Sequence, residues 1–161
     1  MDMRQELAHL GNGAHALAIQ ILGNSDDAAD AVHDAFTTAL AKPGRYDRSR
    51  GPLRPWFLRV VRNRCIDLLR QRRVTEDCVE LLLDGGDSPD DHVATEQRDR
   101  QLQRALGSLP AGQRQIIVLR DYLDLSYAEI SDVLDVAPGT VMSRLHRARL
   151  ALKMVLESND E

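Results

Sequence analysis

The fold of the C-terminal half is decided by residues 125–149, which read LSYAEISDVLDVAPGTVMSRLHRAR. Ser126 and Glu129 form a capping box, in which the serine hydroxyl and the glutamate carboxylate each satisfy a free backbone N–H of a new helix. That helix ends near Leu134, and Pro138 stands where a second helix begins. Two short helices joined by about three residues are typical of a helix-turn-helix.

The second helix of this pair has an apolar side and a polar, basic side. Val141, Leu145, Ala148 and Leu152 recur at helical spacing and predict the buried stripe. The candidate DNA-binding residues of this helix are Thr140, Ser143, Arg144, Arg147 and Arg149. In a helix-turn-helix such residues contact base edges and phosphates in the major groove. No acidic residue occurs between positions 140 and 153, and we therefore predict that this helix binds DNA.

The net charge of the whole chain argues against nucleic acid, but its distribution argues for it. The 161 residues include 21 Lys and Arg against 25 Asp and Glu, a formal charge of −4. Residues 45–73 hold ten arginines and two acids, a net +8, and residues 140–153 hold a net +4. Residues 74–100, between these two blocks, carry −7. Blocks of like charge are typical of interaction surfaces, with solvated helix faces as the alternative.

Three helices are predicted before residue 74. The first ends at Gly23, a typical C-terminal cap, the second runs from Ser25 to Pro43, and the third from about Pro55 to Arg73. Their expected buried stripes are Leu10, Ala14, Leu17 and Ile21, then Val32, Phe36 and Leu40, then Phe57, Val61, Cys65 and Leu68. The polar side of the third helix carries mainly arginines.

The composition of the chain and the positions of its helix-starting and helix-breaking residues predict the fold class. Only 4% of the residues are aromatic, and strands prefer aromatic and β-branched residues. Acidic, glycine-containing sequence follows residue 74, a new helix is expected to start at Ser88-Pro89, and Pro110 opens the next. We predict an all-α protein of two small helical domains, residues 1–73 and 100–161, joined by an acidic flexible linker at residues 74–99.

Several functional classes find no support in the sequence. No apolar run approaches the roughly 18 residues of a membrane span, and no signal peptide opens the chain, so we expect a cytoplasmic protein without membrane insertion. Cys65 and Cys78 form no CxxC pair, and no nucleophile motif or phosphate loop occurs. We expect no enzyme activity, no cofactor and no metal. His33 with Asp30 and Asp34 is open to interpretation as a metal site, but we favour a polar contact surface.

Two sets of segments carry a family resemblance. In the C-terminal half they are Leu109–Arg114, Leu125–Ile130, Pro138–Val141 and Ser143–Arg149; in the N-terminal half they are Leu22–Asn24, Asp27–Asp30, Phe36, Trp56, Arg62-Asn63 and Ile66–Arg70. These sets resemble regions four and two of bacterial sigma factors of the extracytoplasmic-function (ECF) group. The resemblance covers most of the chain, and both sets occur in the expected order.

The resemblance implies promoter recognition at two sites. The helix-turn-helix is expected to read the minus-35 element as duplex. The third helix and the loop before it are expected to bind the minus-10 element as single strand, through Arg54, Arg59, Arg62, Asn63 and Arg70. Asn63 is the favoured base-reading residue, and Trp56 is either a core residue or a base-stacking one. Met142 stands where a basic residue is common and is expected to alter the sequence read.

The resemblance also implies protein partners. The second helix is expected to bind core RNA polymerase through Asp30, His33, Asp34 and Phe36, although His33-Asp34 replaces a common Gln-Glu pair. The holoenzyme would be nucleoid-associated, and a separate anti-sigma protein would silence the factor. The acidic linker is either a mimic of a phosphate chain in a polymerase channel or a disordered tether.

A two-domain repressor or activator that binds DNA without polymerase is the main alternative. It explains the helix-turn-helix, but it leaves the arginine-rich block at residues 45–73 and the first domain without a role. Dependence on polymerase separates the two interpretations.

Overall fold

The computed structural model describes residues 2–159 except residues 77–94, and these residues fold into helices without any strand. The helices are α1 (Met3–Leu22), α2 (Ser25–Ala41), α3 (Leu53–Glu76), α4 (Thr95–Gly107), α5 (Ala111–Ile117), α6 (Tyr127–Leu134) and α7 (Pro138–Asn159). Two 3₁₀ turns, η1 (Pro43–Arg45) and η2 (Arg48–Arg50), precede α3, and a π-helical turn, η3 (Val118–Tyr122), follows α5. The predicted all-α fold is confirmed.

Parts of the prediction fall outside this description. The helix start at Ser88-Pro89 and most of the predicted linker at 74–99 lie outside the described residues. None of the helices described is long and apolar enough to cross a membrane.

The junction between α1 and α2 is set by two adjacent residues. Gly23 has φ +86°, and its N–H donates to the Ile19 carbonyl, as expected for a glycine cap. The Asn24 side chain then accepts a hydrogen bond from the Asp27 N–H at 2.8 Å and caps α2. The prediction that the first helix ends at Gly23 and the second starts at Ser25 is confirmed.

Helices α1, α2 and α3 pack into one core, to which α1 contributes leucines and an isoleucine as well as alanines, and α2 mainly alanines. Buried alanines line α1 and α2, whereas α3 contributes Phe57, Val61 and Cys65, each fully buried. Phe36 stacks on Phe57 with ring centroids 4.9 Å apart. Burial raises the pKa of the Cys65 thiol to about 11, which keeps this thiol protonated and inert.

The expected burial of Leu40 is wrong, since 39% of this residue is exposed. The buried stripe of α2 runs through Ala28, Ala31, Val32, Ala35 and Ala39. Leu40 lies about 100° around the helix from Ala39 and so leaves the stripe at its last turn.

The helix-turn-helix is built as its sequence predicts. Ser126 Oγ accepts from the Glu129 N–H, and Glu129 Oε1 accepts from the Ser126 N–H at 2.9 Å. Asp135 ends α6 in the left-handed conformation with φ +57°. In α7 the side chains of Val141, Leu145 and Ala148 are buried.

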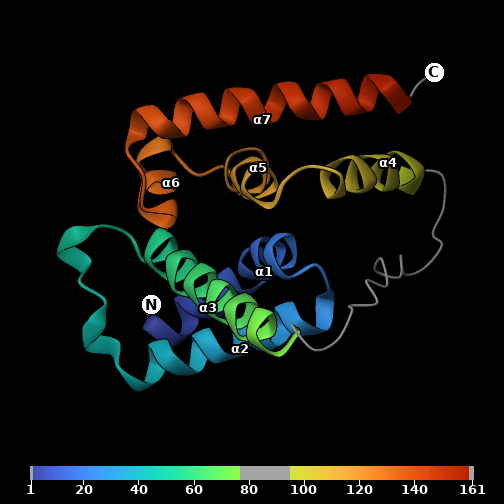
Figure 1. Cartoon of the computed structure of the whole chain (residues 1–161). Coiled ribbons are helices and arrows are strands. Elements are labelled where there is room, and N and C mark those ends of the chain that lie inside the picture. Colours follow the sequence, from blue (N-terminus) through green and yellow to red (C-terminus); the bar gives the residue numbers. More distant parts are fainter. Residues whose placement is uncertain (1, 77–94, 160–161) are drawn as a thin grey trace.

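The two halves pack against each other into one continuous core. Figure 1 shows α5 lying over α1, and α6 lying over the first turns of α3. Gly13 of α1 lies in this contact, because a Cβ atom there would lie 3.0 Å from Leu123 Cδ2. No local sequence signal predicted this contact.

Candidate nucleic-acid and protein interfaces

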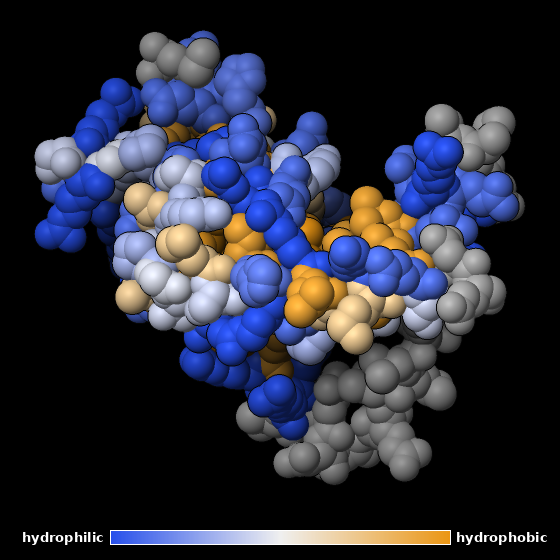
Figure 2. All heavy atoms as spheres, turned by 90° about the horizontal axis from the view of Figure 1, so that it is seen from above, coloured by the Kyte–Doolittle hydropathy of each residue, from blue (hydrophilic) through white to orange (hydrophobic). Residues whose placement is uncertain are grey.

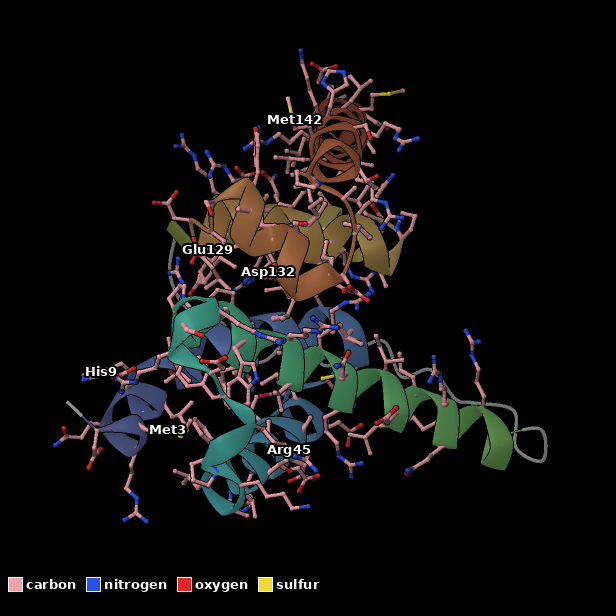
Figure 3. All side chains as sticks on the ribbon, turned by 90° about the vertical axis from the view of Figure 1, so that its left-hand side faces the viewer. Met3, His9, Arg45, Glu129, Asp132 and Met142 are labelled. Atoms are coloured by element: carbon pink, nitrogen blue, oxygen red, sulfur yellow. The ribbon has the colours of Figure 1, made fainter. Side chains whose placement is uncertain are left out.

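The first turns of α7 present a free polar surface. Ser143, Arg144 and Arg147 are exposed, whereas Thr140 is half-buried. Within the part of the chain that the structure describes, neither Arg144 nor Arg147 makes a hydrogen bond or an ion pair. Met142 is 57% exposed on the same surface, and Figure 3 shows it on the side of α7 that faces away from the rest of the molecule. These side chains are available to an external partner.

Arg149 differs from the other arginines of α7. Its guanidinium makes a bidentate ion pair with Asp121 of η3, with Nε 3.1 Å from Oδ2. The hydrogen bond to Asp121 raises the pKa of Arg149 above its ordinary value. Of the five residues predicted on this helix, Arg149 is therefore one that already has a partner.

The far half of α7 carries exposed apolar side chains beside the exposed Lys153 and Glu157. Leu150 and Met154 of α7 are 50% and 62% exposed, and Leu102 of α4 is 40% exposed. Figure 2 shows apolar side chains gathered over this part of α7 and α4, with hydrophilic ones around them. Exposed apolar side chains therefore follow the arginines along α7 and continue onto α4.

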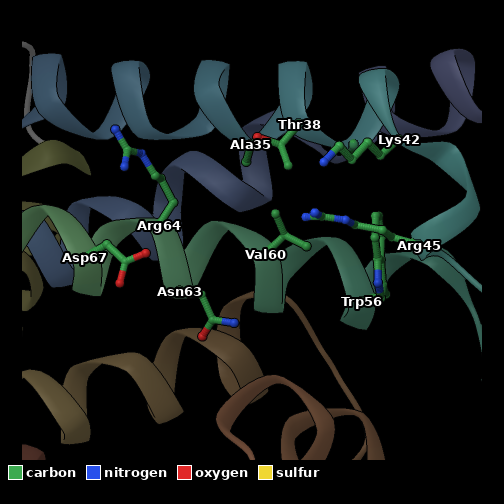
Figure 4. Close-up of a pocket in the computed structure, with 10 residues that line it drawn as sticks. Ala35, Thr38, Lys42, Arg45, Trp56, Val60, Asn63, Arg64 and Asp67 are labelled. Atoms are coloured by element: carbon green, nitrogen blue, oxygen red, sulfur yellow. The ribbon is translucent and has the colours of Figure 1, made fainter.

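Of the predicted minus-10 residues, Asn63 lines a cavity between α2, α3 and the loop that joins them, whereas Arg54, Arg59, Arg62 and Arg70 do not. The cavity, of about 300 Å³, has Trp56 and Val60 as apolar lining, Asn63 as an amide, Lys42, Arg45 and Arg64 as cations, and Asp67 as a carboxylate. Figure 4 shows these residues with Lys42, Arg45 and Trp56 at one end and Arg64 at the other. An apolar wall, an amide and three cations together suit a nucleobase with its phosphate.

The loop that forms one wall of this cavity is held by its own hydrogen bonds. Tyr46 Oη donates to the Gly51 carbonyl at 2.8 Å, and Asp47 accepts from both the N–H and the hydroxyl of Ser49. The side-chain and backbone hydrogen bonds of Ser49 lower the pKa of Asp47. The ring centroids of Trp56 and Tyr46 lie 5.2 Å apart. Trp56 packs against the core, as the core alternative expects, and it also lines the cavity; base stacking by Trp56 stays a prediction.

The predicted minus-10 arginines are not equally free. Arg54 Nη1 donates to the Leu123 carbonyl at 3.1 Å, and its Nη2 lies 3.7 Å from Glu129. Arg59 pairs with Asp135 at 3.7 Å, and Arg62 Nε donates to Gln115 Oε1 at 2.9 Å. Arg70 contacts only Asp67 of its own helix, at 4.0 Å, among the interactions described. Three of the four arginines therefore contact the C-terminal half.

Charge and burial at this contact act on Arg62. Desolvation by burial lowers its pKa, and repulsion from Arg144 and Arg59 lowers it further. Gln115, its hydrogen-bond partner, is 6% exposed. The pKa of Arg62, predicted for one promoter element, is thus affected by the charge of Arg144, predicted for the other.

The predicted polymerase-binding residues of α2 divide into two pairs. Asp30 and His33 are exposed on the outer side of the helix. Asp34 accepts a hydrogen bond from Arg64 Nε at 3.1 Å, and Phe36 packs on Phe57. Among the described residues no group of three His, Cys, Asp or Glu side chains could hold a metal ion, and the metal interpretation of Asp30, His33 and Asp34 has no support.

The sequence did not identify the residues on the opposite side of the contact between the halves. Arg114 donates to the Gln20 carbonyl at the C-terminus of α1, with Nη2 at 2.9 Å. Glu129, Asp132 and Asp135 form a row of carboxylates on one side of α6, which we call the acidic row. The three-residue spacing of these carboxylates is visible in the sequence. The capping box already explains Glu129, so the spacing alone does not predict a contact with the N-terminal half.

Comparisons with known proteins give a consistent result. Residues 7–75 match the family described as Sigma-70 region 2, and residues 99–152 match Sigma-70, region 4. The chain is 30% identical over 152 residues to the RNA polymerase sigma factor SigV of Bacillus subtilis, covering 91% of this chain and 86% of SigV. It is 35% identical over 149 residues to the ECF RNA polymerase sigma factor SigM of Mycobacterium tuberculosis, covering 88% and 70% of the two chains.

Two solved structures share the fold. One is the sigma factor RpoE in complex with the anti-sigma factor NepR from Bartonella quintana, with a TM-score of 0.83, 28% identity and 97% of each chain covered. The other is CnrH in complex with the cytosolic domain of CnrY, with a TM-score of 0.70, 26% identity, and 96% of this chain and 86% of CnrH covered. The first superposition includes both halves, so the two chains share the arrangement of their halves.

Proposed function

The chain belongs to the ECF group of the sigma-70 family, and from this membership we propose which of its residues carry out the work of a sigma factor. A sigma factor binds core RNA polymerase and directs it to start transcription at particular promoters. It is an initiation factor, and we propose that this chain has no catalytic residue or cofactor of its own. We propose residues 1–73 as region two, residues 100–161 as region four, and residues 74–99 as the acidic segment that joins them.

The free basic end of α7 is the observation that carries the assignment of duplex reading. Ser143, Arg144 and Arg147 are exposed on the second helix of a helix-turn-helix, and the two arginines have no partner within the described residues. Arginine presents a planar fork that fits guanine in the major groove. We assign these three residues, together with Thr140 and Arg149, to the minus-35 element.

The cavity beside α3 supports the assignment of minus-10 reading. Promoter opening exposes unstacked bases, which proteins hold by stacking and by polar contacts to the base edge. Asn63 offers an amide at the cavity, and Trp56 and Val60 offer apolar surface. Arg54, Arg59, Arg62 and Arg70 on the same helix would hold the phosphates of that strand.

The outer side of α2 is the proposed polymerase contact. Asp30 and His33 are exposed there and would touch the polymerase directly. Asp34 and Phe36 act differently, because their contacts with Arg64 and Phe57 fix the position of α2 on α3. The chain would therefore act in the cytoplasm, on the nucleoid when it is part of holoenzyme.

An anti-sigma protein is the proposed regulator. Two solved relatives, RpoE of Bartonella quintana and CnrH, are described in complex with the proteins NepR and CnrY. By this similarity we propose that a partner of the same class holds this chain inactive until a signal releases it.

Run-off transcription of genomic DNA with bacterial core RNA polymerase tests the function. The full chain should produce defined start sites only when core is present, and Asp30→Ala should reduce core binding in a pull-down. Asp26→Ala, a matched change on an exposed acid of the same helix, should leave core binding unchanged. Tight footprinting on DNA without core, with no added transcription, would instead support the repressor or activator interpretation.

A further inference from the structure

The outer side of α7 is not covered by any helix that the structure describes. Figure 1 shows α7 as the outermost helix of the C-terminal half, and α5 and α6 pack against its inner side. The buried side chains of Val141, Leu145 and Ala148 mark that inner side. Exposed residues recur on the opposite side, and we call them the outer stripe: Ser143, Arg147, Leu150, Met154 and Glu157.

The spacing of the outer stripe is that of a coiled-coil seam. Its successive members are four, three, four and three residues apart. This alternation keeps a row of side chains on one side of a helix, and it is the pattern by which two helices pack along each other. All five members lie within α7, which is helical from Pro138 to Asn159. The stripe therefore presents one continuous row to a partner helix.

The centre of the outer stripe is apolar. Leu150 is 50% exposed and Met154 is 62% exposed, and they lie one helical turn apart. Figure 2 looks down on this part of the molecule and shows apolar side chains gathered over it. Single apolar residues are ordinary on a protein surface, whereas a neighbouring pair at seam spacing is typical of a contact surface.

The two ends of this apolar pair carry opposite charges. Arg147 stands three residues before Leu150, and Glu157 stands three residues after Met154. Arg147 makes no ion pair or hydrogen bond with any other described residue. The Glu157 carboxylate lies 3.9 Å from Lys153 Nζ, but these side chains are 65% and 70% exposed, so their pair is weak and open to exchange. Both charged groups are therefore available to a partner.

The order of the residues in the stripe is complementary to itself. DNA does not suit the whole stripe, because the Glu157 carboxylate would repel its phosphates. When two α7 helices lie antiparallel, with a twofold axis at residue 152, Arg147 of one meets Glu157 of the other. In the same register Leu150 meets Met154. A twofold axis makes each of these contacts twice, so a second copy of the chain satisfies the charges and the apolar centre together.

We infer that the outer stripe binds the outer stripe of a second copy of this chain, in an antiparallel pair of α7 helices. Two ion pairs between Arg147 and Glu157 then flank two contacts between Leu150 and Met154. A contact along about four turns of one helix is smaller than the roughly 1,600 Å² of a standard stable interface, so the association is weak and reversible.

The pairing has a consequence for Arg147. A guanidinium that pairs with Glu157 of a second copy cannot contact DNA at the same time. Self-association and binding of the minus-35 element therefore compete. This consequence rests on the proposed function, which assigns Arg147 to that element, whereas the pairing itself does not.

Sedimentation equilibrium of the full chain measures the association. The weight-average mass should stay at the 18.0 kDa of one chain at about 5 µM, and it should rise by at least about one quarter at about 300 µM, as expected for a small interface. A wild-type chain that stays monomeric over this range overturns the inference.

Reversed charges test the antiparallel order. Arg147→Glu and Glu157→Arg should each weaken association about tenfold or more, because each brings like charges together at both ends of the pair. The double variant restores opposite charges and should restore the rise in mass. A mixture of the two single variants should also associate, since each supplies the charge that the other lacks. Circular dichroism checks that every variant keeps its helix content.

Matched controls separate the stripe from net charge. Arg4→Glu on α1 and Asp26→Arg on α2 change exposed residues by the same charges, away from α7, and should leave the association as in the wild type. If these controls lose the association, or if the double variant does not regain it, another surface joins the copies and the inference is overturned.

The failure of this inference differs from the failure of the proposed function. Core-dependent start sites from a chain that stays monomeric would refute the pairing and leave the sigma assignment standing. Association that follows the reversed charges, in a chain that gives no core-dependent start sites, would leave the pairing and refute the proposed function.

Discussion

The long helices α3 and α7 are both rich in arginine, yet their arginines have different surroundings. On α3, Arg54, Arg59 and Arg62 contact the opposite half of the protein. On α7, Arg144 and Arg147 are exposed and have no partner among the described residues. A block of positive charge in the sequence therefore predicts where DNA can bind, whereas the tertiary contacts decide which block is available.

The difference has a simple physical origin. In the helix-turn-helix, α6 packs against the inner side of α7, so the outer side of α7 stays exposed. The same helix α6 also packs against α3, because it lies between α7 and α3 (Figure 1). The side of α6 that meets α3 carries the acidic row, so opposite charges meet at that contact. The covered surface of α3 and the free surface of α7 thus follow from one arrangement.

The largest expected effect tests whether the two helices are equally well anchored. Phe57 of α3 is fully buried and Leu145 of α7 is 2% exposed. We expect Phe57→Ala and Leu145→Ala each to lower the free energy of unfolding by about 3–5 kcal/mol, because each leaves a cavity. Urea unfolding followed by circular dichroism measures both. Leu150→Ala, at an exposed position of α7, should change stability by less than about 0.5 kcal/mol. A loss below about 1 kcal/mol for either core variant would mean that its helix is not anchored as described.

The next effect concerns the free arginines of α7. Arg144→Ala should remove about 1–3 kcal/mol of discrimination between a promoter and the same promoter altered in its minus-35 element, because a base contact is lost. Competitive run-off transcription with core polymerase measures this ratio. Lys153→Ala removes one charge from the far end of the same helix and should leave the ratio unchanged. An unaltered ratio in Arg144→Ala would show that this free arginine does not read a base.

Local sequence predicted the helices well because their ends depend on neighbouring residues. The Ser126–Glu129 capping box and the Gly23 cap each need partners only three or four residues away. The stripe of Val141, Leu145 and Ala148 follows from helical spacing alone. These features are fixed by chemistry that is visible within one or two turns.

The contact between the halves could not be predicted in the same way. Arg62 and Gln115 are separated by 53 residues, and Arg114 and Gln20 by 94. Nothing near Gly13 in the sequence shows that Leu123 will lie against it. The sequence therefore predicted which arginines belong to the candidate site. It could not predict that these arginines pair with residues of α5 and α6, because those pairs depend on the tertiary arrangement.

A covered arginine should matter for stability where a free one does not. Arg62→Ala should lower the free energy of unfolding by about 1–2 kcal/mol, because the buried Gln115 Oε1 would lose its donor. Arg147→Ala should change it by less than about 0.5 kcal/mol. Urea unfolding again gives both values. Combining Arg62→Ala with Gln115→Leu should recover most of the loss, and no recovery would show that the hydrogen bond is not its source.

Arg149 provides the smallest effect and the finest test, because it is the arginine of α7 that has a partner, Asp121. The side chains of Arg149 and Asp121 are 48% and 42% exposed, so water and salt screen their attraction. A double-mutant cycle of Arg149→Ala and Asp121→Ala should therefore give a coupling of only about 0.2–1 kcal/mol in the free energy of unfolding, falling further at high salt. Asp121→Asn weakens the hold on Arg149, and it should strengthen binding of the holoenzyme to the minus-35 element only if Arg149 leaves Asp121 to reach a phosphate. Unchanged binding in Asp121→Asn would contradict the assignment of Arg149 to DNA, and would leave Arg144 and Arg147 as the arginines of α7 that are free for that role.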